Sequence, residues 1–119
     1  NMRQLVEGIC SSFGVSAEVN YETTCPVTFN QAKQAEAATK AAITLLGEDK
    51  CNGDIDPRPF SEDFSIMSEN TPGCFVLMGN GTSGSYGRPL HSADYDFNDE
   101  LLVKGSSYWV ELSEQQLKL

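Results

Sequence analysis

Apolar residues near the start of the chain recur every three or four positions. In residues 2–13 they are Leu5, Val6, Ile9, Cys10 and Phe13. This spacing places them on one side of an α-helix, and Gly14 follows as a residue that commonly ends one. The pattern therefore predicts an amphipathic helix over residues 2–13.

Two further stretches have the character of β-strands, but of different kinds. Residues 15–23 alternate apolar and polar side chains, which is typical of a half-exposed strand in an antiparallel sheet. Residues 74–79, Cys-Phe-Val-Leu-Met-Gly, are apolar on both faces, as in a strand buried within a sheet that helices cover. Neither stretch finds enough partner strands within 119 residues. We therefore expect the chain to be part of something larger.

Three more helices are predicted in the remainder of the chain. Residues 31–46 are rich in alanine and follow Asn30, a good N-cap residue. Residues 61–70 predict a short helix, and a last helix begins after Asn98. The apolar face of this last helix consists of Leu101, Leu102, Tyr108, Trp109 and Leu112. Gly105 lies on that face at a cost of about 1 kcal/mol relative to alanine, so we expect a neighbour to pack closely there. This order of helices and strands predicts an α/β or α+β fold.

The charge of the chain excludes some classes of function. With 17 Asp and Glu against 8 Lys and Arg, the net charge is −9 and the pI is about 4.4. Nucleic-acid binding needs a basic surface, so we expect none. Binding to an anionic membrane surface is disfavoured by the same repulsion. The longest apolar run, residues 74–79, is far too short to span a bilayer.

The cysteines bear on the cellular compartment. They are Cys10, Cys25, Cys51 and Cys74. No two of them form a CxxC pair, which disfavours a zinc ribbon or a redox motif. Cys10 and Cys74 lie in apolar stretches, as buried free thiols do in a reducing cytoplasm. We therefore expect a cytoplasmic protein.

A glycine-rich loop and an acidic stretch resemble known motifs only in part. Residues 79–84, Gly-Asn-Gly-Thr-Ser-Gly, have the spacing of a dinucleotide-binding loop, but Gly87 and Pro89 would break the helix that must follow. Residues 94–98 begin like a calcium-binding EF-hand loop, but Asp99 stands where that loop needs a glycine. We reject both interpretations.

His91 is the sole histidine of the chain and follows the glycine-rich loop. Acidic residues come close behind it: Asp94, Asp96, Asp99 and Glu100. An imidazole in a loop after a buried strand can ligate a divalent ion, since α/β proteins tend to keep their chemistry there. A catalytic zinc usually needs three protein ligands, so His91 would be half of such a site at most. The alternative is an ordinary structural histidine.

Glu62 and Asp63 stand at the start of the predicted helix over residues 61–70. The simpler interpretation is that these carboxylates compensate the helix dipole. The alternative is a carboxylate directed at a site, where it would hold a substrate group or a metal-bound water.

Several short motifs occur together along the chain. They are Tyr21, Pro26 and Asn30; Glu62-Asp63-Phe64; Pro72-Gly73; Leu90-His91; and Tyr95-Asp96-Phe97-Asn98. In this combination, and over essentially the whole chain, the sequence resembles the C-terminal part of the metal-dependent amidohydrolases. That family includes hippurate hydrolase, N-acyl-amino-acid amidohydrolases and indoleacetyl-amino-acid hydrolases, and it is related to aminoacylase and zinc carboxypeptidases.

The resemblance implies a two-domain metallohydrolase, in which a smaller α+β lid domain interrupts a catalytic α/β domain. Residues 1–24 resemble the last helix and strand of the lid, and residues 25–119 resemble the part that closes the catalytic α/β domain. The two unlike strands would then belong to different sheets. The lid also serves dimerisation in the family, which leaves a homodimer open. The expected partner of this chain is the N-terminal half of the same protein.

For activity, the resemblance implies cleavage of the amide bond of N-acyl or N-aroyl amino acids or of small peptides. Two divalent ions, zinc or manganese, would activate a water and polarise the amide carbonyl. His91 occupies the position of a metal ligand in the family. The remaining ligands and the general base are expected upstream. We therefore assign no catalytic residue to this chain, and we expect it to be inactive alone and to hold no metal tightly.

The resemblance places further residues around the site with less detail. Glu62 and Asp63 would lie near the metals or the substrate, and the backbone of Gly79 and Asn80 would border the substrate pocket. Two other functions stay open. One is a self-contained binding module that uses the acidic loop 91–100 for a cation or a partner, which predicts a closed core within 119 residues. The other is a non-catalytic oligomerisation piece.

Overall fold

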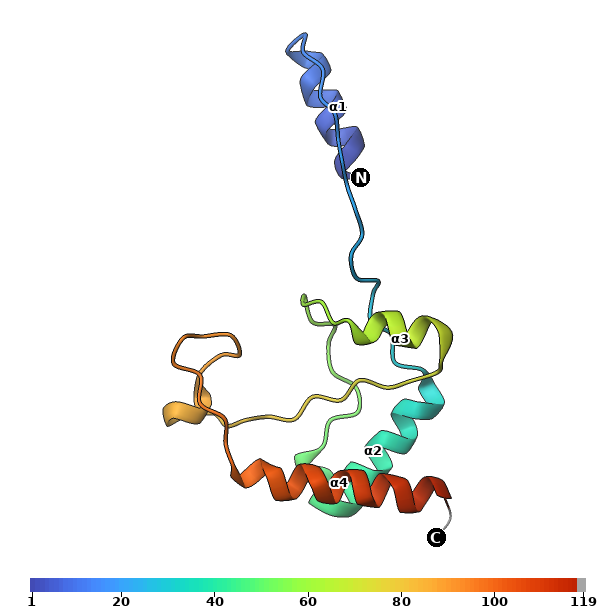
Figure 1. Ribbon diagram of the computed structural model, residues 1–119, viewed down its shortest axis with the longest axis vertical. Helices are drawn as coiled ribbons and strands as arrows, with labels where there is room; N and C mark the ends of the chain where they lie inside the picture. The colour runs from blue at the N-terminus through green and yellow to red at the C-terminus, as the bar shows by residue number, and fades with distance from the viewer. Residues whose placement is uncertain (118–119) are drawn as a thin grey trace.

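The computed structural model describes residues 1–117, which form four α-helices and two short 3₁₀ helices (Figure 1). In chain order these are α1 (Met2–Ser12), α2 (Ala32–Leu46), η1 (Glu48–Lys50), α3 (Phe64–Asn70), η2 (Gly84–Gly87) and α4 (Glu100–Leu117). All four predicted α-helices are confirmed, with α3 beginning three residues later than expected. None of these helices has the length and hydrophobicity needed to cross a membrane.

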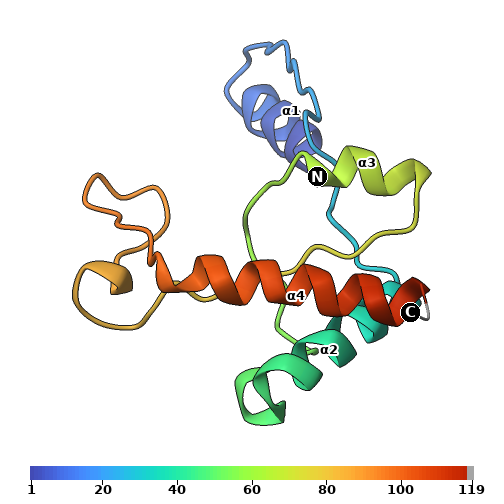
Figure 2. The same cartoon turned by 60° about the horizontal axis from the view of Figure 1, so that its bottom comes forward.

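The main packing contact of the fold is between α2 and α4, which cross each other (Figure 2). Ala38 and Ala41 of α2 are buried there together with Tyr108 of α4. The two alanines let the helices approach closely, and the Tyr108 hydroxyl donates a hydrogen bond to the carbonyl of Ala38 at 3.4 Å. The neighbouring Trp109, predicted on the same apolar face, stays 64% exposed. The core formed by residues 1–117 is therefore small.

Gly105 of α4 has Met78 as a neighbour, but Met78 does not pack so closely that it requires glycine. A Cβ atom added to Gly105 would lie 3.8 Å from Cε of Met78, which is ordinary van der Waals contact. Met78 belongs to the extended stretch 74–79. This stretch therefore runs past α4 near the middle of the helix.

A second small cluster anchors α3. The rings of Phe64 and Phe75 lie 5.5 Å apart between centroids and are tilted by 46°. The Phe64 ring also covers Gly73, where an added Cβ would come within 2.8 Å of the Phe64 Cζ atom. Only glycine leaves room for this ring. The Pro72-Gly73 motif thus has a packing role that fixes the start of α3.

The two predicted strands are extended but unpaired, so the α/β expectation is not met among residues 1–117, which are helical with no strand. A strand is defined by backbone hydrogen bonds to a neighbouring strand. Within the described chain, neither 15–23 nor 74–79 makes such a bond to another extended stretch. Side chains make some of the hydrogen bonds that a neighbouring strand would otherwise make. Asn30 donates from Nδ2 to the Phe75 carbonyl at 2.9 Å and accepts from the Phe75 amide at 2.7 Å.

The predicted N-cap role of Asn30 is wrong, because the amide of Asn30 is used to hold Phe75. The N-cap position of α2 is Gln31, which makes no capping hydrogen bond with its side chain. Its Oε1 atom accepts from the Gly73 amide at 2.7 Å instead. The predicted cap at Asn98 is confirmed, since its Oδ1 accepts from the Glu100 amide at 3.1 Å.

The molecule is far from compact. Helix α1 and the extended stretch after it stand away from the remaining helices (Figure 1), and the extents are 66 × 37 × 21 Å. The radius of gyration is 20.3 Å, compared with about 13.5 Å for a compact domain of this length. The accessible surface is 9831 Å², compared with roughly 6300 Å² for a folded monomer of this mass. These values disagree with the closed core that a self-contained module predicts.

Candidate functional site

His91 lies at the tip of a tight turn formed by residues 89–92. The Ser92 amide donates to the Pro89 carbonyl at 3.1 Å, and the Ser92 hydroxyl donates to the same oxygen at 2.8 Å. The φ angle of His91 is 70°, and His91 is the one non-glycine residue in the described part of the chain with a positive φ. The third position of a type II turn requires such an angle and usually holds glycine. The exposed imidazole thus occupies a backbone conformation that costs about 1–2 kcal/mol.

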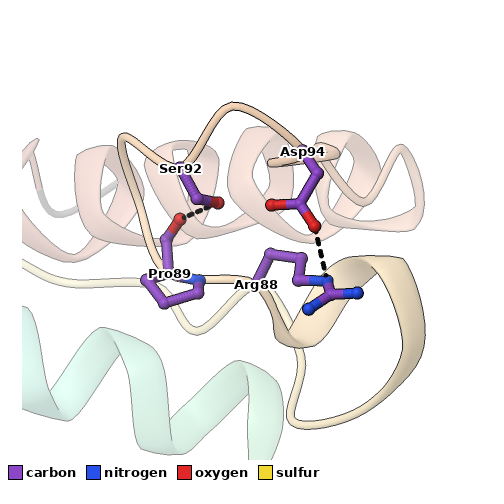
Figure 3. Close-up of polar contacts among 4 residues, drawn as sticks. All are labelled: Arg88, Pro89, Ser92 and Asp94. Carbon is purple, nitrogen blue, oxygen red and sulfur yellow. Dashed lines mark hydrogen bonds and ion pairs between the residues drawn. The ribbon is translucent and has the colours of Figure 1, made fainter.

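An ion pair joins two residues on either side of this turn. Nε of Arg88 lies 3.0 Å from Oδ2 of Asp94, three residues on either side of His91 (Figure 3). Both side chains are more than half exposed. Because solvent screens such a pair, it contributes about 0–1 kcal/mol to stability. It joins the residues before and after the turn 89–92.

Asn80 joins two parts of the same loop that lie outside the Arg88–Asp94 pair in the sequence. Its Nδ2 donates to the Tyr86 carbonyl at 3.0 Å and to the Asp96 carbonyl at 2.8 Å, and its Oδ1 accepts from the Asn98 amide at 2.9 Å. A second bond runs from Nδ2 of Asn98 to the Asn80 carbonyl at 3.3 Å. The sequence motifs contained both asparagines, but nothing in the sequence indicated that they pair.

Two glycines of residues 79–87, Gly81 and Gly87, allow the loop to pack on itself. A Cβ added to Gly81 would come within 2.8 Å of the Tyr86 Cβ, and one added to Gly87 within 2.8 Å of the Thr82 carbonyl carbon. A single 3₁₀ turn, η2, follows Ser83. The long helix that a dinucleotide-binding loop needs does not follow, which agrees with our rejection of that motif.

The other predicted site residues lie apart from His91 in their contacts. Asp63 is the N-cap residue of α3 and is exposed, and its side chain makes no capping bond. Glu62 is half-buried. Within residues 1–117, neither carboxylate forms a hydrogen bond or ion pair with the His91 loop. Gly79 is exposed, with nothing within 4 Å of an added Cβ. Their roles stay predictions.

The described residues contain no closed metal site, and His91 is the one candidate ligand that the sequence predicted. Nowhere in residues 1–117 do three His, Cys, Asp or Glu side chains gather closely enough to hold a metal ion. His91 offers an exposed imidazole, which suits one ligand of a zinc or manganese centre, but a catalytic centre needs at least two more. This arrangement fits half of a metal site.

The four cysteines are free thiols, as expected for Cys10 and Cys74, although both are half-buried rather than buried. Burial raises the pKa of the Cys74 thiol above its ordinary value. Burial also raises the pKa of Tyr108, and the charge of Cys74 adds to that shift. Both shifts favour the neutral form. Cys74 lies beside Lys33 and Ala37 of α2 and Tyr108 of α4, so we assign it to the packing around these helices.

Known proteins similar to this chain include several hydrolases. The chain is 30% identical to hippurate hydrolase of Campylobacter jejuni over 115 residues, which are 97% of this chain and 29% of that protein. It is 32% identical to N-acetylcysteine deacetylase of Bacillus subtilis over 114 residues, which are 95% of this chain and 28% of that protein. Thermostable carboxypeptidase 2 of Saccharolobus solfataricus is 27% identical over 108 residues, 88% of this chain and 26% of that protein.

The chain thus spans less than a third of the length of the relatives it matches. No solved structure gives a significant match. Residues 4–115, nearly the entire chain, match one family of proteins. The chain belongs to peptidase family M20/M25/M40.

Proposed function

We propose that these 119 residues form the C-terminal part of a metal-dependent hydrolase that cleaves the amide bond of N-acyl or N-aroyl amino acids or of small peptides. The relatives named for hippurate, for N-acetylcysteine and for carboxypeptidase action all have an amide bond next to an amino-acid unit as their target. The observation that carries the proposal is the single imidazole of His91, held at the tip of a closed loop in a strained conformation.

In this proposal His91 holds one of two divalent ions, zinc or manganese. When bound, such ions activate a water and polarise the amide carbonyl. The turn 89–92 and the Arg88–Asp94 pair form the loop that presents this imidazole. The other ligands and the general base come from the upstream part of the protein, so the 119 residues alone are inactive.

The division of the chain supports the same proposal. Residues 1–24 would be the end of a lid domain and residues 25–119 the end of the catalytic domain. Helix α1 contacts none of the other described helices, and it keeps a row of exposed apolar side chains. The members of that row are Met2, Leu5, Ile9 and Phe13. The upstream part of the same protein is the partner we propose for this surface and for the exposed stretch 76–78.

A metal titration of this chain tests the half-site. We expect calorimetry with zinc and with manganese to detect no tight binding, and we expect His91→Ala to change little. One imidazole cannot supply the three protein ligands of a tight site. If the native chain bound one ion tightly and His91→Ala did not, the acidic loop 91–100 would complete a site by itself. The binding module would then replace the hydrolase.

A chimera tests the activity. Residues 4–115 would replace the matching segment of the Campylobacter jejuni hippurate hydrolase, and hippurate cleavage and bound metal would be measured together. We expect His91→Ala to lower both the rate and the metal content, the rate by more than about 100-fold. Asn52→Ala is the control, because Asn52 only accepts a bond from the Asp54 amide in a distant loop. Full activity of the His91→Ala chimera would refute the proposal.

A further inference from the structure

Three sets of contacts join the two sides of the loop that carries His91, and each set joins residues further from His91 in the sequence than the one before. The innermost is the turn from Pro89 to Ser92, and the next is the Arg88–Asp94 ion pair. The outermost is Asn80, whose Nδ2 donates one hydrogen bond to each of Tyr86 and Asp96. These two carbonyls lie five residues before and five residues after His91 in the sequence. One amide group therefore holds both arms of the loop with the imidazole at its tip (Figure 3 shows the two inner sets).

Asn80 also connects the loop to the packed helices. Its Oδ1 accepts from the Asn98 amide at 2.9 Å, and its carbonyl accepts from Asn98 Nδ2 at 3.3 Å. Asn98 in turn caps α4 through the Glu100 amide, and α4 packs on α2 through the buried Tyr108. A series of hydrogen bonds thus connects α4, which packs on α2, to the base of the His91 loop.

The Asn80 amide is the strongest of these closures on physical grounds. It is half-buried, and it uses both donor hydrogens and one acceptor on backbone groups. The Arg88–Asp94 pair is exposed and is weakened by salt. The inner turn contains a strained residue, so it does not hold its shape by local preference.

We propose that Asn80 is a positioning residue for His91. Its amide fixes the two arms of loop 80–98 and thereby sets where the imidazole lies relative to the stretch 74–79. This inference rests on the proposed function, in which His91 is a metal ligand. It assigns Asn80 a role through its side chain, whereas the family resemblance pointed only to its backbone.

The first test is NMR relaxation on the 119-residue chain, with the backbone order parameter of His91 as the readout. We expect about 0.85 in the native chain and less than about 0.6 in Asn80→Asp. Aspartate keeps the acceptor for Asn98, but it turns an oxygen toward the carbonyls of Tyr86 and Asp96. Asn80→Ala, which removes all three side-chain bonds without adding charge, should give the same result.

Asn30→Ala is the matched control. Asn30 makes two amide-to-backbone bonds at the other end of the same stretch, both to Phe75. We expect Asn30→Ala to lower the unfolding midpoint while the His91 order parameter stays at its native value. An order parameter that is low in the native chain, unchanged in both Asn80 variants, or equally reduced in Asn30→Ala would overturn the inference.

The second test uses the hippurate hydrolase chimera, with zinc affinity as the readout. We expect Asn80→Asp to weaken zinc binding by about 10–100-fold, the usual effect of removing a group that orients a metal ligand. Asn30→Ala should leave zinc affinity unchanged. If His91→Ala abolishes metal binding but Asn80→Asp does not weaken it, the role of Asn80 fails and the proposed function stands. If His91→Ala binds metal normally, the proposed function fails, whatever the order parameters show.

Discussion

At the scale of single residues, His91 combines an unfavourable backbone with a chemically useful side chain. Its φ of 70° would suit glycine better than an imidazole-bearing residue. Strained residues concentrate where a function requires them, because random substitution would otherwise relieve the strain. The conformation therefore marks His91 as an unusual residue, and its role as a metal ligand stays a proposal.

This strain predicts that His91→Gly raises stability while it removes the ligand. Relief of the left-handed conformation gains about 1–2 kcal/mol, and the greater freedom of glycine in the unfolded chain costs about 0.5–1 kcal/mol. We expect a net gain of about 0.5–1 kcal/mol in the free energy of unfolding, measured by urea denaturation. Leu90→Gly, next to it in the same exposed turn, should lose stability instead. A loss of stability in His91→Gly would show that the turn does not strain the native chain.

At the scale of elements, the helices were predictable and the strand partners were not. A helix is specified by neighbours three and four positions away, so α1, α2 and α4 follow from local patterns in the sequence. The N-cap prediction for Asn30 is wrong because Phe75, the partner of its side chain, lies 45 positions further along the chain. Strand pairing is hard to predict for the same reason, because the partner of a strand can lie far away in the sequence. The apolar character of 74–79 is evident, but within residues 1–117 this stretch makes no backbone-to-backbone hydrogen bond to another extended segment.

In the candidate site, too, some features could be predicted from the sequence and others could not. The proposal that His91 is a metal ligand came from a motif, whereas the hydrogen bonds by which Asn80 closes the loop could be recognised only in the fold. Positive φ is most often adopted by glycine, and a histidine adopts it too rarely for the sequence to predict it here. The rejected dinucleotide motif could be excluded from Gly87 and Pro89 alone, since helix breakers act locally.

Gly105 of α4 provides a prediction at this scale. Gly105→Ala should raise the free energy of unfolding by about 1 kcal/mol through helix propensity. The added methyl group would lie 3.8 Å from Met78 Cε, so there is room for it. Gly105→Leu is the control, because leucine has good helix propensity but would displace Met78. Thermal unfolding followed by circular dichroism should rank alanine above glycine and leucine below alanine. Equal gains would mean that Met78 does not pack on α4.

At the scale of the whole molecule, the excess surface and the unpaired stretches have one explanation. Large apolar side chains are exposed on α1 and along residues 76–78, whereas monomers rarely expose long apolar surfaces. The relatives are more than three times as long as this chain. The proposed upstream part would cover this surface, pair the stretch 74–79 and bring the missing metal ligands to His91.

The same view predicts where a protease first cuts the 119-residue chain. Residues 16–30 make no backbone-to-backbone hydrogen bond within the described chain, and Glu18 and Glu22 are exposed there. A glutamate-specific protease should therefore cut at these two positions first and leave a fragment containing α2, α3 and α4, which mass spectrometry would identify. Glu18→Gln combined with Glu22→Gln should delay the first cut by at least about tenfold. Cleavage that began at Glu36, inside α2, would contradict the boundary between residues 1–24 and the remainder of the chain.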